Sequence, residues 1–119
     1  MVTTPTLAAQ SGLAERLRAL FATRPHQVRE TRMFGTLAFM VDDAMAVAAR
    51  RDGGLLVRVD PARYDELLEA GGAPALMGPN RSMGRGWLTV EAAQLASDDE
   101  LERWVDIGIE ARPKEGDAR

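Results

Sequence analysis

The chain has 119 residues, no cysteine and a formal net charge of −3. This length predicts one domain that can bury a core of its own. The lack of cysteine excludes disulfides, thiolate nucleophiles and thiolate metal sites. No apolar run approaches the about 20 residues of a membrane span, and residues 1–10 lack the pattern of a secretory signal, so we expect a cytoplasmic protein without membrane contact.

Charge is distributed unevenly along the chain. Residues 1–60 carry a net charge of +2, whereas residues 61–119 carry −5. Binding to nucleic acid usually requires a basic excess on one face, because phosphate contacts supply much of the affinity. Direct DNA binding would therefore depend on a local arginine patch, and we rank it below protein contact.

The first predicted element is a helix that begins near Leu7 or Ser11. Apolar residues recur there at helical spacing and form a single stripe. The residues of that stripe are Leu13, Leu17, Leu20 and Phe21. Pro25 should end the helix, because proline disfavours helical geometry at the residue before it.

Residues 32–59 are interpreted as three antiparallel strands joined by two tight turns, and the rest of the chain is organised around them. The evidence is a series of short apolar runs, 33–41, 45–49 and 55–59, bounded by Asp and Gly. Residues 28–31 start a further strand or lead into the first. The run 33–41 is apolar on both faces, so we expect it to be central and covered on both sides, or covered by a second copy.

The period of two in a strand assigns faces to the second run. Met45, Val47 and Ala49 should share one face of the sheet. The opposite face carries only small residues, which suits close packing of a helix. Its residues are Ala44, Ala46 and Ala48.

After the sheet, the Asp60-Pro61 pair predicts the start of a helix over 61–70, which Gly71 and Gly72 end. Residues 73–86 are rich in Gly and Pro, so we expect a long connection with little regular structure before a last strand over 87–90. A capping box, Ser97 with Glu100, then starts a helix that reaches about residue 111. Its predicted apolar stripe consists of Leu101, Trp104, Val105 and Gly108.

The order of elements is helix, three to four strands, helix, strand, helix. A run of consecutive strands favours an α+β fold with an antiparallel sheet over a doubly wound parallel one. We expect a single domain over 1–119 with an ordered core at about 7–111, a frayed N-terminus and a charged C-terminal tail.

No catalytic, cofactor or metal site is predicted. His26 has no Ser, Cys or carboxylate at a meaningful spacing, so it is not assigned as a general base. Asp42, Asp43 and Asp52 are interpreted as turn formers, because their spacing matches no metal-binding loop. The glycine-rich segment 78–86 could bind an anion through backbone amides, but its spacing matches neither the phosphate-loop nor the dinucleotide signature.

The candidate contact residues are arginines and large apolar side chains near the predicted sheet. Arginines can bind an anion or an acidic partner. These candidates are Arg29, Arg32, Arg58, Arg81 and Arg85. Exposed members of the apolar set would indicate an interface. These candidates are Phe34, Phe39, Met40 and Trp87. The acidic series in 98–110 is interpreted as a solvated helix face, with a docking surface for a basic partner as the alternative.

Several segments resemble the N-terminal domain of the TfoX/Sxy family. The first are Arg32-Met33-Phe34-Gly35, Phe39-Met40-Val41, Met45-Ala46 and Leu55-Leu56-Val57-Arg58-Val59-Asp60. Later ones are Met83-Gly84-Arg85-Gly86-Trp87 and Leu101-Glu102-Arg103-Trp104-Val105. The resemblance covers about residues 13–111. One departure is Asp42-Asp43, which stands where family members often carry Asn-Gly, a pair that adopts positive φ more readily.

The resemblance implies a fold similar to secretion-chaperone-like domains, and the family offers no catalytic residues to transfer. Its competence regulators carry a second, C-terminal domain that this sequence leaves no room for, so the resemblance implies the fold more directly than a role in competence. We expect a non-enzymatic, homodimeric protein-interaction module that acts on transcription through a regulator or polymerase. The alternatives are direct DNA binding through an arginine patch and a small-anion or ligand site using Arg81, Arg85 and Trp87.

Overall fold

The computed structural model describes residues 5–33, 35–78 and 81–111. The helices are α1 (Pro5–Phe21), α2 (Tyr64–Glu69) and α3 (Asp98–Ala111), with 3₁₀ turns η1 (Pro61–Arg63) and η2 (Ala92–Leu95). The strands are β1 (Val28–Met33), β2 (Thr36–Val41), β3 (Ala44–Ala49), β4 (Leu55–Arg58), β5 (Ala73–Pro74), β6 (Leu76–Gly78), β7 (Arg81–Ser82) and β8 (Trp87–Val90).

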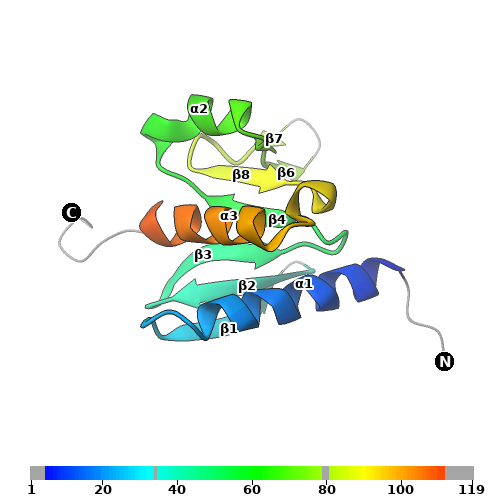
Figure 1. Cartoon of the computed structure of the whole chain (residues 1–119). Helices are drawn as coiled ribbons and strands as arrows, with labels where there is room; N and C mark the ends of the chain where they lie inside the picture. The colour runs from blue at the N-terminus through cyan, green and yellow to red at the C-terminus, as the bar shows by residue number, and fades with distance from the viewer. Residues whose placement is uncertain (1–4, 34, 79–80, 112–119) are drawn as a thin grey trace.

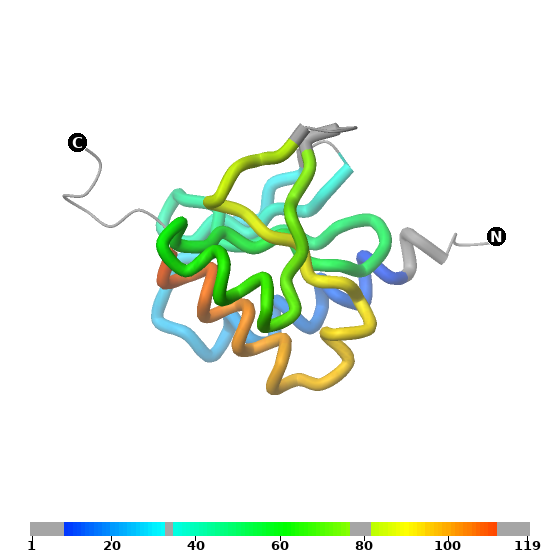
Figure 2. Tube along the Cα trace, turned by 90° about the horizontal axis from the view of Figure 1, so that it is seen from above, coloured from blue at the N-terminus to red at the C-terminus, as the bar shows by residue number. Residues whose placement is uncertain are grey.

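Six strands form one antiparallel sheet in the order β1-β2-β3-β4-β8-β5, and β6 and β7 form a separate two-stranded hairpin. Helices α1 and α3 cover one face of the sheet (Figure 1). Seen from above, the β6–β7 hairpin lies on the opposite side (Figure 2). The predicted α+β class with an antiparallel sheet is confirmed.

The first helix lies where the apolar stripe predicts it. α1 spans Pro5–Phe21, and Leu13, Leu17 and Phe21 are buried in the core. The helix ends four residues before Pro25, in a turn where the Thr23 N–H donates to the Leu20 carbonyl at 3.1 Å. The stripe therefore holds α1 on the sheet by burial of apolar surface.

The single strand predicted over 33–41 is wrong. β1 ends at Met33 and β2 begins at Thr36, so the apolar run contains a hairpin turn. Gly35 lies in this turn at φ 81°, a conformation that costs glycine little. Strand β2 is second in the sheet order and not central. Both of its faces are covered, since Ala38 and Phe39 point to opposite sides and both are buried.

A β-bulge changes the predicted faces of β3. Phe39 pairs with Val47, but the next residue of β2, Met40, pairs with Met45, so Ala46 is an extra residue in the ladder. Met45 therefore lies on the opposite face from Val47, against the strict alternation predicted from sequence. The extra residue Ala46 lies in the core beside Val47.

Helix α3 packs closely against this bulge. Leu101, Trp104 and Val105 are buried, as the predicted stripe requires. At Gly108 an added Cβ would lie 2.5 Å from the Ala46 carbonyl oxygen. The helix can approach β3 this closely only because Gly108 has no side chain. Ser97 caps its start as predicted, where the Glu100 N–H donates to Ser97 Oγ at 3.0 Å, and the Glu100 carboxylate accepts from Arg103 Nε at 3.3 Å.

The segment between β4 and β8 is partly as predicted. Asp60 Oδ1 accepts a hydrogen bond from the Ala62 N–H at 2.9 Å and caps the turn η1, which leads into α2. The prediction that 73–86 has little regular structure is wrong, because it contains β5, β6 and β7. These strands are two or three residues long, so their pairing depends on neighbours in space that no periodicity reveals.

Candidate functional site

Strand β1 forms one edge of the six-stranded sheet and pairs only with β2 among the described strands. It has six residues in unbroken register, with no proline and no bulge. The opposite edge, β5, has two residues, one of which is Pro74. Proteins commonly protect open edges by such short strands and prolines, because unpaired backbone groups invite another strand. β1 lacks both protections.

The backbone contacts show which groups of β1 face outward. The Asp42 N–H donates to the Gln27 carbonyl at 2.9 Å. In an antiparallel ladder, hydrogen-bonded pairs alternate with non-bonded ones. The backbone groups of Val28, Glu30 and Arg32 therefore point to the open edge and offer three N–H donors and three carbonyl acceptors to another chain.

The side chains of Glu30 and Arg32 are held by α1. Arg18 donates twice to the Glu30 carboxylate, from Nε to Oε2 at 2.6 Å and from Nη2 to Oε1 at 2.8 Å. This bidentate hydrogen bonding lowers the pKa of Glu30 and raises the pKa of Arg18. Arg32 Nη1 donates to Gln10 Oε1 at 3.4 Å. Helix α1 thus orients one acid and one base along the open edge.

Gln10, which no sequence pattern singled out, links α1 to the turn between β1 and β2 and to the end of β3. Its side chain is only 3% exposed, and Nε2 donates to the Gly35 carbonyl at 2.9 Å and the Ala49 carbonyl at 3.0 Å. Gln10 lies three residues before Leu13, in line with the apolar stripe. A polar residue in such a stripe is the signal that could have indicated a buried hydrogen-bonding role.

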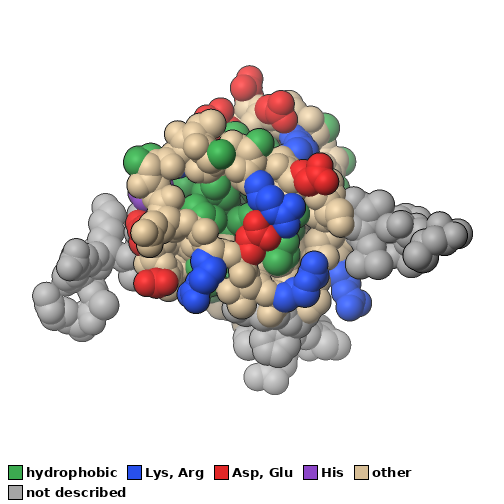
Figure 3. All heavy atoms as spheres, turned by 90° about the horizontal axis from the view of Figure 1, so that it is seen from below, with side chains coloured by type: hydrophobic (Ala, Val, Ile, Leu, Met, Phe, Trp, Pro, Cys, Tyr) green, Lys and Arg blue, Asp and Glu red, His purple; other side chains and the backbone are tan. Residues whose placement is uncertain are grey.

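A hollow of about 310 Å³ lies between α1 and β1, and its lining combines the apolar Phe21, Val28 and Phe39 with the charged Arg18 and Glu30. Figure 3 views this side of the molecule and shows apolar side chains gathered beside adjoining basic and acidic groups. Phe39 itself is 1% exposed and stacks on Phe21 with ring centroids 5.5 Å apart. Its expected place at an interface is therefore wrong, because the side chain belongs to the core.

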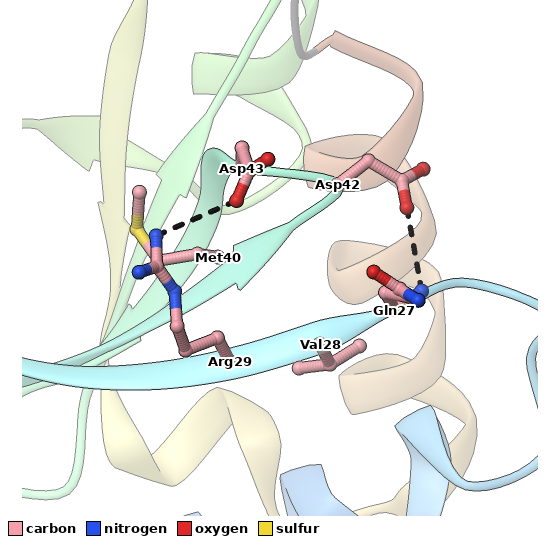
Figure 4. A pocket seen from close by; sticks show the side chains of 6 residues that line it. All are labelled: Gln27, Val28, Arg29, Met40, Asp42 and Asp43. Carbon is pink, nitrogen blue, oxygen red and sulfur yellow. Dashed lines mark hydrogen bonds and ion pairs between the residues drawn. The ribbon is translucent and has the colours of Figure 1, made fainter.

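Arg29 and Met40 lie side by side at a second hollow of about 400 Å³, near the turn between β2 and β3 (Figure 4). Arg29 Nη2 lies 3.5 Å from Asp43 Oδ1, and both side chains are largely exposed. Met40 is half-buried. The arginine faces a carboxylate of its own chain, so this hollow is a poor place for an anion.

The Asp42-Asp43 pair forms the turn between β2 and β3 with φ of 51° and 73°. Both residues adopt the left-handed backbone conformation, as in the type I′ hairpin turn that Asn-Gly usually makes. Asp42 Oδ2 also lies 3.2 Å from His26 Nδ1, so His26 has the carboxylate contact that no sequence spacing revealed.

Arg58 and Trp87 lie on the helix-free face of the sheet, away from β1. The Arg58 guanidinium lies 4.6 Å from the ring centroid of the half-buried Trp87, and Nε donates to the Met45 carbonyl at 2.7 Å. Burial lowers the pKa of Arg58. Within the described part of the chain, no carboxylate forms an ion pair with it.

The remaining candidates are not gathered around Arg58. Arg85 lies over the Tyr64 ring at 4.8 Å and pairs with Asp65 at 3.2 Å. Arg81 belongs to β7, but its side chain lies outside the described residues, as does Phe34. The structure therefore divides the predicted arginines between the β1 edge and the region of β4, α2 and β8, and the described ones form no single anion patch.

The acidic face of α3 is partly engaged by the chain itself. Arg24 binds Asp106 through Nε at 3.1 Å and Glu102 through Nη2 at 3.0 Å. These hydrogen bonds raise the pKa of Arg24. Arg16 also pairs with Asp98 at 3.0 Å. The alternative of an acidic docking face for a basic partner thus applies to fewer side chains than the sequence suggested.

Within residues 5–33, 35–78 and 81–111, no group of three His, Asp or Glu side chains could hold a metal ion. No helix of that same part is both long and apolar enough to cross a bilayer. The most distinctive surface of the described structure is therefore the β1 edge.

Comparison with known proteins supports one assignment. A family model described as the TfoX N-terminal domain matches residues 19–112, which is most of the chain. The chain belongs to this family. No curated protein and no solved structure gave a significant match. The TfoX N-terminal domain match starts inside α1 and extends past α3, so it includes β1 and every other strand of the sheet.

Proposed function

We propose that this TfoX N-terminal domain is a non-enzymatic protein-interaction module and that it binds a partner through the open edge of β1. One observation carries the proposal: a six-residue edge strand without proline or bulge presents the backbone groups of Val28, Glu30 and Arg32 outward. Addition of a strand from another chain would satisfy these groups by main-chain hydrogen bonds.

The surroundings of the single histidine support binding over catalysis. His26 contacts Asp42, a pairing that could in principle activate a nucleophile. The two hollows beside this pair are lined without any Ser, Thr or Tyr side chain. The hollow that His26 lines instead combines apolar side chains with the Arg18–Glu30 ion pair, which suits contact with another protein.

The charges favour a protein partner over DNA. Of the arginines on the described surface, Arg18, Arg24 and Arg29 each already face a carboxylate of the same chain. Such pairs reduce the positive potential that phosphate contacts require. The family's link to competence regulators supports a role in transcription, in which the module acts on a transcription regulator or polymerase in the cytoplasm.

Site-specific crosslinking in host cells tests the proposal. A photo-reactive amino acid at Thr31, on the edge strand, should give covalent protein adducts after irradiation. The same group at Glu69, exposed on α2, is the matched control. Adducts specific to position 31 that survive nuclease support the module. Equal or absent protein adducts at both positions, or adducts to nucleic acid only, would refute it.

A further inference from the structure

We propose that the partner at this edge is a second copy of the chain, whose β1 pairs antiparallel with β1 so that Thr31 faces Thr31 of the second copy. The two six-stranded sheets would then join into one continuous sheet. This inference rests on the proposed function, because it names the strand that the edge accepts.

The alternation of backbone groups leaves few two-fold registers. The outward groups belong to Val28, Glu30 and Arg32, so these residues must form the hydrogen-bonded pairs across the new contact. A register centred on Glu30 places the two Glu30 carboxylates opposite each other, and like charges in that position are destabilising. A register centred on Arg29 places Glu30 opposite Val28.

Only the register centred on Thr31 places Glu30 of each copy opposite Arg32 of the other. The pairing of Glu30 with Arg32 therefore occurs twice in the dimer. Directly opposite residues have Cβ atoms about 5 Å apart, within reach of both side chains. The strand carries its acid and its base at positions symmetric about Thr31, so one surface patch is complementary to itself, as a two-fold dimer requires.

The side chains of Arg32 and Glu30 can both form an ion pair with the second copy. Arg32 forms no ion pair with a described carboxylate, and its hydrogen bond to Gln10 Oε1 is long, at 3.4 Å. Glu30 binds Arg18, but a carboxylate has about four acceptor positions and can accept from a second arginine. Because Arg18 of α1 holds the Glu30 carboxylate, that side chain loses less freedom on pairing.

The helix side of the edge is compatible with the same arrangement. A two-fold axis that joins antiparallel strands into one sheet keeps both α1 helices on the same face. The hollow of about 310 Å³ between α1 and β1 would then lie next to the second copy. The apolar part of its lining, which includes Phe21 and Val28, would be removed from water there.

Sedimentation equilibrium of charge variants tests the contact. Glu30→Arg and Arg32→Glu each place like charges opposite each other twice per dimer, so each should raise the dissociation constant of the dimer about tenfold or more. An equimolar mixture of the two variants should recover dimer as a heterodimer, because every opposed pair is again of opposite sign. Arg85→Glu makes the same charge change as Arg32→Glu but away from β1, so it should leave the dimer unchanged.

A cysteine variant tests the register. The natural chain has no cysteine, and opposite residues of a non-hydrogen-bonded pair have Cα atoms about 4.5 Å apart, a separation that a disulfide spans. Thr31→Cys should therefore oxidise to a covalent dimer. Arg29→Cys should not, because in this register the two positions 29 lie about 13 Å apart along the strands.

The outcomes separate this inference from the proposed function. A wild-type protein that stays monomeric at high micromolar concentration, or a mixture of charge variants that does not recover dimer, overturns the β1–β1 dimer. If position 31 still crosslinks to a different protein in cells, the interaction module stands and its partner is another chain. A dimer that forms in all variants alike lies on another surface and also overturns the inference.

Discussion

Replacement of Gly108 by alanine tests how closely α3 lies on the sheet. An alanine Cβ at this position would lie 2.5 Å from the Ala46 carbonyl oxygen and 2.9 Å from Val47 Cγ1. Ordinary van der Waals contacts between such atoms have separations of about 3.5 Å or more. The nearer atom is backbone oxygen in β3, held by the sheet, so α3 must move outward by roughly 1 Å.

The expected cost follows from two opposing effects. Overpacking of this kind destabilises a protein by about 1–3 kcal/mol, occasionally more. Alanine in a helix interior gains about 1 kcal/mol over glycine. Because an outward shift of α3 would also loosen the buried side chains of Leu101, Trp104 and Val105, we expect a net loss of about 2 kcal/mol. For a domain of this size that lowers Tm by about 8 °C.

Gly12→Ala is the matched control, because it makes the same substitution inside a helix with no atom within 4 Å of the new Cβ. It should stabilise the protein by about 1 kcal/mol. Urea unfolding followed by circular dichroism measures both variants. If Gly108→Ala unfolds at the same or a higher urea concentration than the wild type while Gly12→Ala is stabilised, close packing of α3 on the bulge is refuted.

Three further substitutions test other contacts. Gln10→Ala should lower the free energy of unfolding by about 2 kcal/mol, because the buried Ala49 carbonyl and the partly buried Gly35 carbonyl lose their donor. A loss below about 0.5 kcal/mol in urea unfolding would contradict this link. Asp43→Gly should raise stability by up to about 1 kcal/mol, since the residue has a φ of 73°, and a drop in Tm would argue against a left-handed turn. The depressed pKa of Glu30 means that its ion pair with Arg18 stabilises the fold above the unfolded-state pKa, about 4.3, and that this contribution is lost as pH falls through the folded-state pKa. Glu30→Gln should therefore have a lower free energy of unfolding than the wild type at neutral pH, and this free energy should fall less on acidification than that of the wild type. Parallel pH profiles of the free energy of unfolding for the two proteins would exclude the effect.

The sequence by itself determined the features that depend on neighbours along the chain. The stripe Leu101, Trp104 and Val105 lies on the buried face of α3, and Ser97 caps that helix as the pattern predicts. Asp60 likewise caps the turn that leads into α2. These features follow from periodicity and from hydrogen bonds between residues two or three apart, both of which can be read directly from sequence.

Only the tertiary structure decided the features that depend on strand pairing. The apolar run 33–41 hides the turn at Gly35, because apolar residues on both sides of a hairpin leave no polar break. The bulge at Ala46 moves Met45 to the other face, which no alternation rule can show. β1 is an open edge because later strands add to the sheet on the β4 side, where β8 and β5 follow β4 in the strand order. Strand order joins residues far apart in sequence, so the position of Glu30 and Arg32 on an unpaired edge became visible only in the folded chain.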